Sequence, residues 1–331
     1  MASAALGALS GAKAQESSDE QVNRVAPLAK GAYFHQGDIQ HQGHCNNGWI
    51  VFKDYVLVVD ANFPSGAQNI LPKIRALTPK PVRFAFDTHH HGDHAYGNQV
   101  WVENGATPLA HTGVIEEMKR YETGYYGQKP GRWEQEAKSR PDVAASRLSP
   151  PSLLFPTEIY FDDNEQRVEL VHLGVAHTHG DAMAWLPKER ILFTGDACVN
   201  GPYNFVGDGN IEKWVVTLDA AKKLGARTIC PGHGPLGEAS VLDDQQLFFK
   251  QLRELVGAQI QAGKDAREVY KSIPTIQGEL VSQRQIARYV PKEGVGADVE
   301  KVYGEMTGGS FPPDLKPANS ARLRHRLAHS G

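Results

Sequence analysis

The chain of 331 residues has few cysteines, no long apolar run and no excess of positive charge. Its three cysteines, Cys45, Cys198 and Cys230, are too few and too far apart to form a disulfide framework. No segment approaches the roughly 20 consecutive apolar residues that cross a bilayer, so we expect no membrane insertion. With a formal net charge of -3, the chain also lacks the basic field that holds phosphates, which argues against a nucleic acid partner.

What is present is the composition of an ordinary globular protein, with 40% hydrophobic and 22% charged residues. Small residues dominate the first part of segment 1–20, and polar residues follow. Ala12-Lys13-Ala14 has the small-x-small form that signal peptidase cuts, although a charged start and a long apolar run are missing. We therefore expect a periplasmic or secreted protein with a signal peptide, and a disordered Ala/Ser-rich tail is the alternative.

The chain begins with β-like segments separated by tight turns and continues with strands that alternate with helical patterns. The predicted strands are Gly31–Phe34, Trp49–Lys53, Val56–Asp60, Val82–Asp87, Pro108–Ala110, Val168–Leu173, Met183–Leu186, Ile191–Gly195 and Thr228–Cys230. The predicted helices are Ala67–Leu77, Thr112–Tyr121, Ile211–Leu224, Leu242–Gln261, Val281–Tyr289 and Ala297–Met306. This order predicts an α/β protein with mixed sheets and helices on their outer faces.

We divide the chain into a signal-like or disordered tail (1–20), a main domain (21–265), a helical extension of that domain (266–310) and a tail expected to be disordered (311–331). The helices from Leu242 onward form a homodimer interface or cover the main domain; the sequence leaves both open. The polar segment Tyr121–Pro151 is too long for a plain connection. Such an insertion is a lid or substrate wall, or a surface excursion without function.

The strongest chemical pattern is Thr88-His89-His90-His91-Gly92-Asp93-His94, which directly follows a predicted strand. In an extended chain His89, His91 and Asp93 project to one side, and a turn at Gly92 brings His94 round to join them. Imidazoles and carboxylates are ligands that zinc accepts, so this segment predicts more than half of a dinuclear metal site. His90, on the opposite side, is expected to pack or to face solvent.

Further candidates follow later strands: His177 in AHTHGD, Asp196 in FTGD and His233 in PGHGP. Ligands at the ends of several strands meet at one rim of a sheet, where catalytic groups collect. We expect these three side chains to complete the site.

With these motifs the sequence resembles the metallo-β-lactamase superfamily, because HHHGDH, AHTHGD, FTGD and PGHGP occur in the family's order. The likeness spans roughly Val25 to Gln261 and implies a four-layer αββα sandwich, to which the C-terminal helices would be added. It assigns a first metal ion to His89, His91 and His177. It assigns a second to Asp93, His94 and His233, with Asp196 bridging the two.

The resemblance implies a hydrolase with two Zn²⁺ per chain, and iron or manganese can occupy such sites. Two divalent ions lower the pKa of a shared water from about 15.7 to near neutrality. The hydroxide would attack the carbonyl of a small-molecule ester, thioester, lactone or amide. Asp93 and Asp196 are the catalytic candidates: Asp93 would orient the hydroxide or take its proton, and Asp196 would bridge the ions.

Two alternatives remain open. True β-lactamases of the superfamily carry Cys or Ser at the place of Asp196, which favours the thioesterase and lactonase branches but leaves β-lactam amides as possible substrates. An alternative of another class is a metal-binding or sensory protein that retains the ligands without turnover.

Several residues near these motifs have less definite roles. Asp60 matches a family aspartate that hydrogen-bonds a ligand imidazole, and a strand-end turn former is the alternative. The pattern AHTxGD makes His177 the ligand, which leaves His179 near the site, facing substrate or merely exposed. Cys198 is expected in the core, because a free Cys commonly behaves as a small buried hydrophobe.

Three histidines belong to the Gly-rich stretch around the first turn, namely His35, His41 and His44. In the family this stretch borders the mouth of the site. Contact with substrate and simple solvation in a loop are equally compatible with the sequence.

Overall fold

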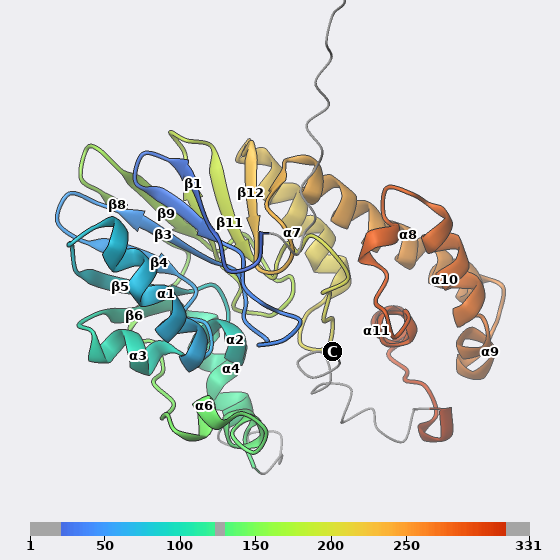
Figure 1. Cartoon of the computed structure of the whole chain (residues 1–331). Helices are drawn as coiled ribbons and strands as arrows, with labels where there is room; N and C mark the ends of the chain where they lie inside the picture. Colours follow the sequence, from blue (N-terminus) through green and yellow to red (C-terminus); the bar gives the residue numbers. More distant parts are fainter. Residues whose placement is uncertain (1–20, 123–129, 316–331) are drawn as a thin grey trace, which may run out of the picture.

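The computed structural model describes residues 21–122 and 130–315, which form two β-sheets with helices around them (Figure 1). The first sheet contains, in spatial order, β1 (Val25–Ala29), β2 (Ala32–His35), β3 (Asn47–Val51), β4 (Val56–Val59), β5 (Val82–Asp87), β6 (Thr107–His111) and β7 (Leu153–Phe155). The second contains β13 (Gly237–Glu238), β12 (Thr228–Pro231), β11 (Ile191–Gly195), β10 (Met183–Leu186), β9 (Arg167–Val171) and β8 (Glu158–Asp162).

The helices connect these strands or follow them. They are α1 (Pro64–Leu77), α2 (Gly92–Ala95), α3 (Asn98–Glu103), α4 (Thr112–Glu122), α5 (Arg132–Glu136), α6 (Pro141–Ala144), α7 (Ile211–Lys223), α8 (Ser240–Gln261), α9 (Ala266–Lys271), α10 (Ile273–Ser282) and α11 (Gly296–Thr307). None of the helices in the described ranges combines the length and apolar character needed to cross a membrane.

Both sheets are mixed, as predicted. Strands β1 to β4 form an antiparallel meander, whereas β4, β5, β6 and β7 run parallel. In the second sheet β8 to β11 are antiparallel neighbours, and β12 pairs in parallel with β11 after the crossover through α7. Parallel neighbours end at the same edge of their sheet, so the loops after β4 and β5 leave together, as do those after β11 and β12.

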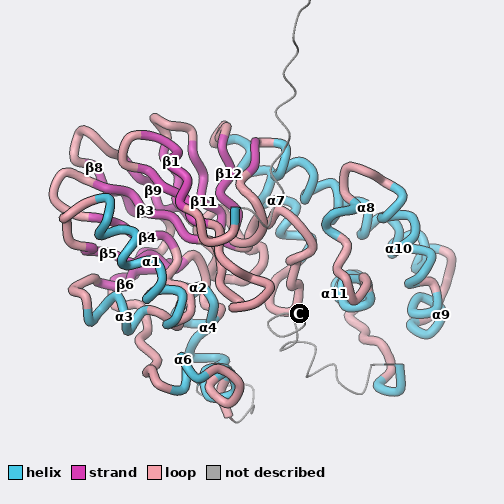
Figure 2. The backbone as a smooth tube through the Cα atoms, viewed as in Figure 1, coloured by secondary structure: helices cyan, strands magenta, loops and turns pink. Residues whose placement is uncertain are grey.

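Apolar side chains fill the space between the two sheets and also the space beneath the helices on each outer face. The layer between the sheets includes Ile50, Leu57, Phe86, Leu170, Leu186 and Phe193. Outside the first sheet, Ile70 and Ile74 of α1 and Trp101 of α3 pack on Trp49 and Val58. Outside the second, Trp214 of α7 and Phe248 and Phe249 of α8 pack on Trp185 and Leu192. The predicted four-layer αββα sandwich is therefore confirmed, with helices flanking the strands in Figure 2.

The C-terminal helices are additional to the sandwich and pack on α8. Val299 and Val302 of α11 are fully buried in the same core as α7 and α8. The predicted helix Val281–Tyr289 is wrong: α10 already begins at Ile273 and ends at Ser282, and only a short 3-10 helix follows at Ala287–Tyr289. Pro274 near the start of α10 is a helix-start signal that the apolar spacing alone overlooked.

The two predicted tails fall largely outside the described residues, which exclude 1–20 and 316–331. Where the second tail is described, Phe311 is buried and lies 5.5 Å from the Tyr303 ring, centroid to centroid. The division at residue 265 stays a prediction. The insertion Tyr121–Pro151 contributes α5 and α6, and its residues 123–129 lie outside the described part.

Candidate metal centre

The loop after β5 delivers four of the predicted ligands to one place. His89 and His94 are fully buried, and helix α2 starts at Gly92, so the chain turns where the sequence predicted. A Cβ at Gly92 would lie 2.5 Å from the ring of Tyr96, which only glycine avoids.

One group of nitrogens gathers around His91. Its Nδ1 lies 2.8 Å from Nε2 of His177. His89 joins them, with candidate ligand atoms of all three residues within 4.8 Å of one another. Nε2 of His89 is buried and has no hydrogen-bond partner in the described part of the chain. Burying a polar atom without a partner costs free energy, and a cation bound to this nitrogen would remove that cost.

A second group forms around Asp93. Its Oδ2 lies 3.1 Å from Nε2 of His233 and 3.4 Å from Nε2 of His94. The two imidazole nitrogens are themselves 3.5 Å apart. Atoms bound to a tetrahedral zinc at 2.0–2.1 Å lie roughly 3.3 Å from one another, so the spacing of both groups suits a small divalent cation.

Asp196 lies between the two groups. Its Oδ2 is 3.5 Å from Nε2 of His177 and 3.3 Å from Nε2 of His233, while its Oδ1 is 3.3 Å from Nε2 of His94. One carboxylate thus faces both sets of nitrogens. The structure brings together all seven predicted side chains, although their role as ligands stays a prediction.

The protonation of the imidazoles differs between the two groups. Burial, reinforced by the neighbouring His91, lowers the pKa of His177 to about 3, and burial also holds the pKa of His89 well below its ordinary value. Burial alone would raise the pKa of Asp93 and Asp196, but the histidines beside them lower both. Burial alone would lower the pKa of His94 and His233, but the acidic groups beside them raise both, that of His233 to about 9. Because neutral imidazoles and ionised carboxylates are the forms that bind metal, a cation in the second group would displace protons from these two histidines.

Asp60 has the position predicted for it. Its Oδ2 lies 3.0 Å from Nδ1 of His94, on the side of the ring away from Asp93. Its Oδ1 accepts hydrogen bonds from the backbone N–H and hydroxyl of Thr88. Asp60 adopts a left-handed backbone conformation, with φ of 65°. A residue keeps such a conformation where the surrounding contacts hold it. For Asp60 these are the contacts with Thr88 and His94, through which the aspartate orients the imidazole.

Asp208 is a functional candidate that sequence reasoning missed. It lies in the loop between β11 and α7, is buried, and places Oδ2 2.9 Å from Nε2 of His91. Burial would raise its pKa, but hydrogen bonds from His91 and Arg132 hold that pKa well below the usual range. The sequence marked Asp208 only weakly, as an aspartate between Gly207 and Gly209, downstream of the strand that precedes Asp196.

The other residues near the motifs, His179, His90 and Cys198, differ in their surroundings. The side chain of His179 is 48% exposed and lies beside Glu117 at 3.5 Å, so it lies apart from the cluster. His90 is buried and stacks on Tyr121, which agrees with the predicted packing role. Cys198 lies in the core, as predicted.

The three histidines of the Gly-rich stretch differ from one another. His35 is buried beside Lys73, at 3.2 Å. His41 is exposed and pairs with Asp38 of its own loop. His44 is buried, with Nε2 2.8 Å from the hydroxyl of Ser65. His41 is thus in a solvated loop, while contact of the other two with substrate stays a prediction.

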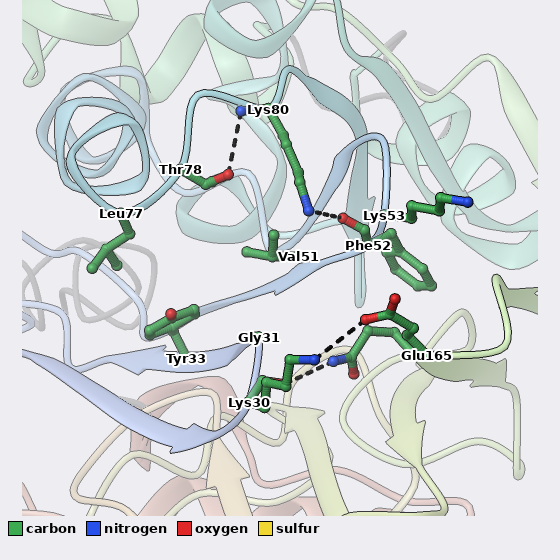
Figure 3. A pocket seen from close by; sticks show the side chains of 11 residues that line it. Lys30, Gly31, Tyr33, Val51, Phe52, Lys53, Leu77, Thr78, Lys80 and Glu165 are labelled. Atoms are coloured by element: carbon green, nitrogen blue, oxygen red, sulfur yellow. Dashed lines mark hydrogen bonds and ion pairs between the residues drawn. The ribbon is translucent and has the colours of Figure 1, made fainter.

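A pocket of about 270 Å³ lies elsewhere on the molecule (Figure 3). It is lined by the turn before β2, the end of β3 and the segment after α1, including Lys30, Tyr33, Lys53 and Thr78. These residues are at the amino end of β4, whereas Asp60 follows its carboxyl end. The pocket contains none of the cluster residues.

Comparison with known proteins agrees with this geometry. Residues 42–233 match the sequence model of the metallo-beta-lactamase superfamily. The chain belongs to this superfamily. The superfamily consists of metallo-hydrolases, and the cluster of His and Asp side chains in this chain can hold metal.

Relatives within the superfamily cover different parts of the chain. A metallo-beta-lactamase type 2 of Bacteroides fragilis is 30% identical over 92 residues, which are 26% of this chain and only 37% of that protein. The beta-lactamase-like protein 2 homolog of Caenorhabditis elegans is 23% identical over 284 residues, covering 81% of this chain and 85% of its own. A solved metallo-beta-lactamase from Pontibacter korlensis superposes with a TM-score of 0.56 at 17% identity, over 69% of this chain and 98% of that one. This last likeness shows the fold alone.

Proposed function

We propose that this chain is a dinuclear zinc hydrolase that cleaves a carbonyl compound: an ester, thioester, lactone or amide of a small molecule. The position of Asp196 carries the proposal, because its two oxygens lie within 3.5 Å of nitrogens from both groups. A bridging carboxylate needs an ion on each side, whereas a mononuclear site would leave half of these ligands without a cation.

The two groups divide the ligands as the resemblance implies. His89, His91 and His177 would hold one ion, Asp93, His94 and His233 the other, and Asp196 both. Imidazole and carboxylate donors suit zinc, and they also accept iron or manganese. When bound, the cations supply Lewis acidity toward a carbonyl oxygen and make water a strong nucleophile at neutral pH.

The exposure of the candidate ligands indicates the side from which substrate approaches. His89 and His94 are fully buried, whereas the side chains of His91 and Asp93 are 15% and 21% exposed. The cluster therefore opens on the side of Asp93, whose carboxylate can hold and accept a proton from the attacking water. On the buried side of the cluster, Asp60 keeps the imidazole of His94 in place.

Aromatic rings flank the cluster. Phe205 lies 5.6 Å from the His91 ring and 6.1 Å from that of His177, and Tyr203 lies 5.8 Å from that of His233. These rings favour a substrate with an apolar group beside its carbonyl.

A second candidate function is hydrolysis of the β-lactam amide. It is favoured by the partial match to the Bacteroides enzyme, and disfavoured by Asp196, because true β-lactamases have Cys or Ser there. A metal-binding or sensory protein without turnover is the alternative outside catalysis. Export and homodimer formation also stay proposals, which cell fractionation and sizing in solution would test.

The decisive experiment is a substrate panel on metal-free and zinc-loaded protein. Thioester, lactone, β-lactam and phosphodiester substrates would be compared under identical conditions. We expect hydrolysis of a carbonyl substrate that stops on chelation and returns when zinc is restored, with no phosphodiester cleavage. Full zinc loading without turnover would favour the non-catalytic alternative, and turnover unaffected by chelation would contradict the metal centre itself.

A further inference from the structure

Within the described part of the insertion Tyr121–Pro151, an arginine reaches the candidate metal centre. Arg132, the first residue of α5, forms a two-pronged ion pair with Asp208. Its two terminal nitrogens donate to the two carboxylate oxygens at 2.5 and 2.9 Å. Such a bidentate pair is geometrically specific and stronger than a neutral hydrogen bond.

Asp208 carries this contact onward to a candidate ligand. Its Oδ2, which accepts from Arg132, also lies 2.9 Å from Nε2 of His91. The Tyr121 hydroxyl donates to Oδ1 at 2.9 Å. With its side chain only 3% exposed, Asp208 has exchanged water for these three partners.

The middle histidine of HHHGDH takes part as well. Arg132 donates to Nε2 of His90 at 3.3 Å, and its guanidinium lies 3.5 Å from the centre of the Tyr121 ring. The Tyr121 ring in turn stacks on His90, with the planes only 2° apart. His90 thus holds Arg132 and Tyr121 in place, through a hydrogen bond and a stacking contact. Its position in the sequence among the candidate ligands did not indicate this role.

The consequence for His91 follows from imidazole chemistry. When Nε2 of His91 donates its proton to Asp208, the lone pair of Nδ1 faces the cluster, where His177 lies 2.8 Å away. A buried carboxylate keeps its negative charge only when it is compensated, and Arg132 is the cation that does so.

We propose that Arg132 is a positioning residue of the metal centre, which acts through Asp208 to hold His91 in its ligand geometry. This inference rests on the metal site proposed above. Through Arg132, the described part of the insertion is then part of the site's scaffold.

Arg140 of the same insertion provides a matched control. It also anchors the segment: it donates to the carbonyl of Gln42 at 2.8 Å and lies 3.7 Å from the centre of the Phe63 ring. Its side chain is more buried than that of Arg132, and its partners Gln42, Asp142 and Phe63 include none of the candidate ligands. If Arg132 only tethered the insertion, losing either arginine would have the same effect.

The experiment measures Co²⁺ binding to metal-free protein by visible absorption, for the wild type and for R132Q, R132K, D208N and R140Q. Circular dichroism of each metal-free variant reports folding separately. We expect R132Q and D208N to bind Co²⁺ about 10- to 100-fold more weakly, with an altered absorption band. R132K, which keeps the charge but loses the fork, should fall between R132Q and the wild type. R140Q should keep the wild-type affinity.

Wild-type affinity and spectrum in R132Q and R132K would overturn the inference while leaving the metal centre intact. An equal loss in R140Q would overturn it too, because tethering would then explain both. If the wild type itself binds no Co²⁺, the proposed metal centre fails, and this inference fails with it.

Discussion

The two sheets contribute to the centre in different ways. The first sheet supplies four candidate ligands from one loop, His89 to His94, directly after β5. The second supplies His177, Asp196 and His233 from three separate loops. A contiguous segment brings its ligands together by local geometry, whereas the separate loops depend on the packing of the whole sheet.

The junction of β11 and β12 shows what that packing requires. Gly195 pairs with Pro231 in the parallel ladder, which places Gly232 against the Asp196 carboxylate. A Cβ at Gly232 would be 2.1 Å from Oδ1 of Asp196. The second half of the site therefore depends on a glycine that is not itself a ligand.

The most direct way to break the comparison is Asp196→Ala, which removes the group shared by both halves. Losing several kcal/mol of cation stabilisation corresponds to a roughly 1000-fold or greater drop in hydrolysis of the best panel substrate. Elemental analysis should also find less metal per chain. The control is Asp243→Ala, at a side chain that is 58% exposed on α8. Retention of full activity and full metal content by Asp196→Ala would refute the bridging role.

Gly232→Ala tests the dependence of the second half on packing. Because the new methyl group collides with Asp196, we expect loss of about 1–3 kcal/mol of unfolding free energy and a roughly 100-fold fall in activity. Denaturant unfolding and kinetics would measure the two effects.

Gly278→Ala is the matched control for that substitution. Gly278 is in the middle of α10, and a Cβ built there has no heavy atom of the described residues within 4 Å besides its chain neighbours and its own helix backbone. Its stability should be unchanged or higher by up to about 1 kcal/mol, since alanine is the better helix former. If Gly232→Ala behaves like Gly278→Ala, the close approach to Asp196 is unimportant.

Asp60→Asn tests the half of the site that the first sheet contributes. Asparagine tolerates the left-handed conformation and can still accept from Thr88, but it removes the charge that faces His94. We expect Co²⁺ affinity to fall about 10- to 100-fold with only a small change in unfolding free energy. Asp54→Asn, at an exposed position of the turn between β3 and β4, should change neither quantity. Affinity within twofold of the wild type would show that Asp60 is only a turn former.

Much of the sandwich could be predicted from hydrophobic patterns, because its central strands are buried and bounded by turns. Strands β4, β5, β10 and β11 appear within one residue of their predicted bounds. Strands β1, β7, β8 and β13 were missed: they are only partly buried, and a half-exposed strand at a sheet edge has little apolar periodicity. The helix predicted at Val281–Tyr289 failed for a similar reason, since short apolar runs do not fix where a helix begins.

By itself, the sequence indicated the candidate ligand cluster after β5, because four donor side chains lie within six residues and the chain turns at Gly92, the first residue of α2. The parity of an extended chain could not separate His177 from His179, and only the resemblance to the family assigned the ligand role to His177. The tertiary structure gives the physical reason, because the packing of the loop turns His177 toward His91 and His179 toward Glu117. Only the tertiary structure brought together Arg132 and Asp208, which are 76 positions apart. No local pattern marks two distant residues as partners, and their contact exists only because the fold brings the start of α5 next to the loop before α7.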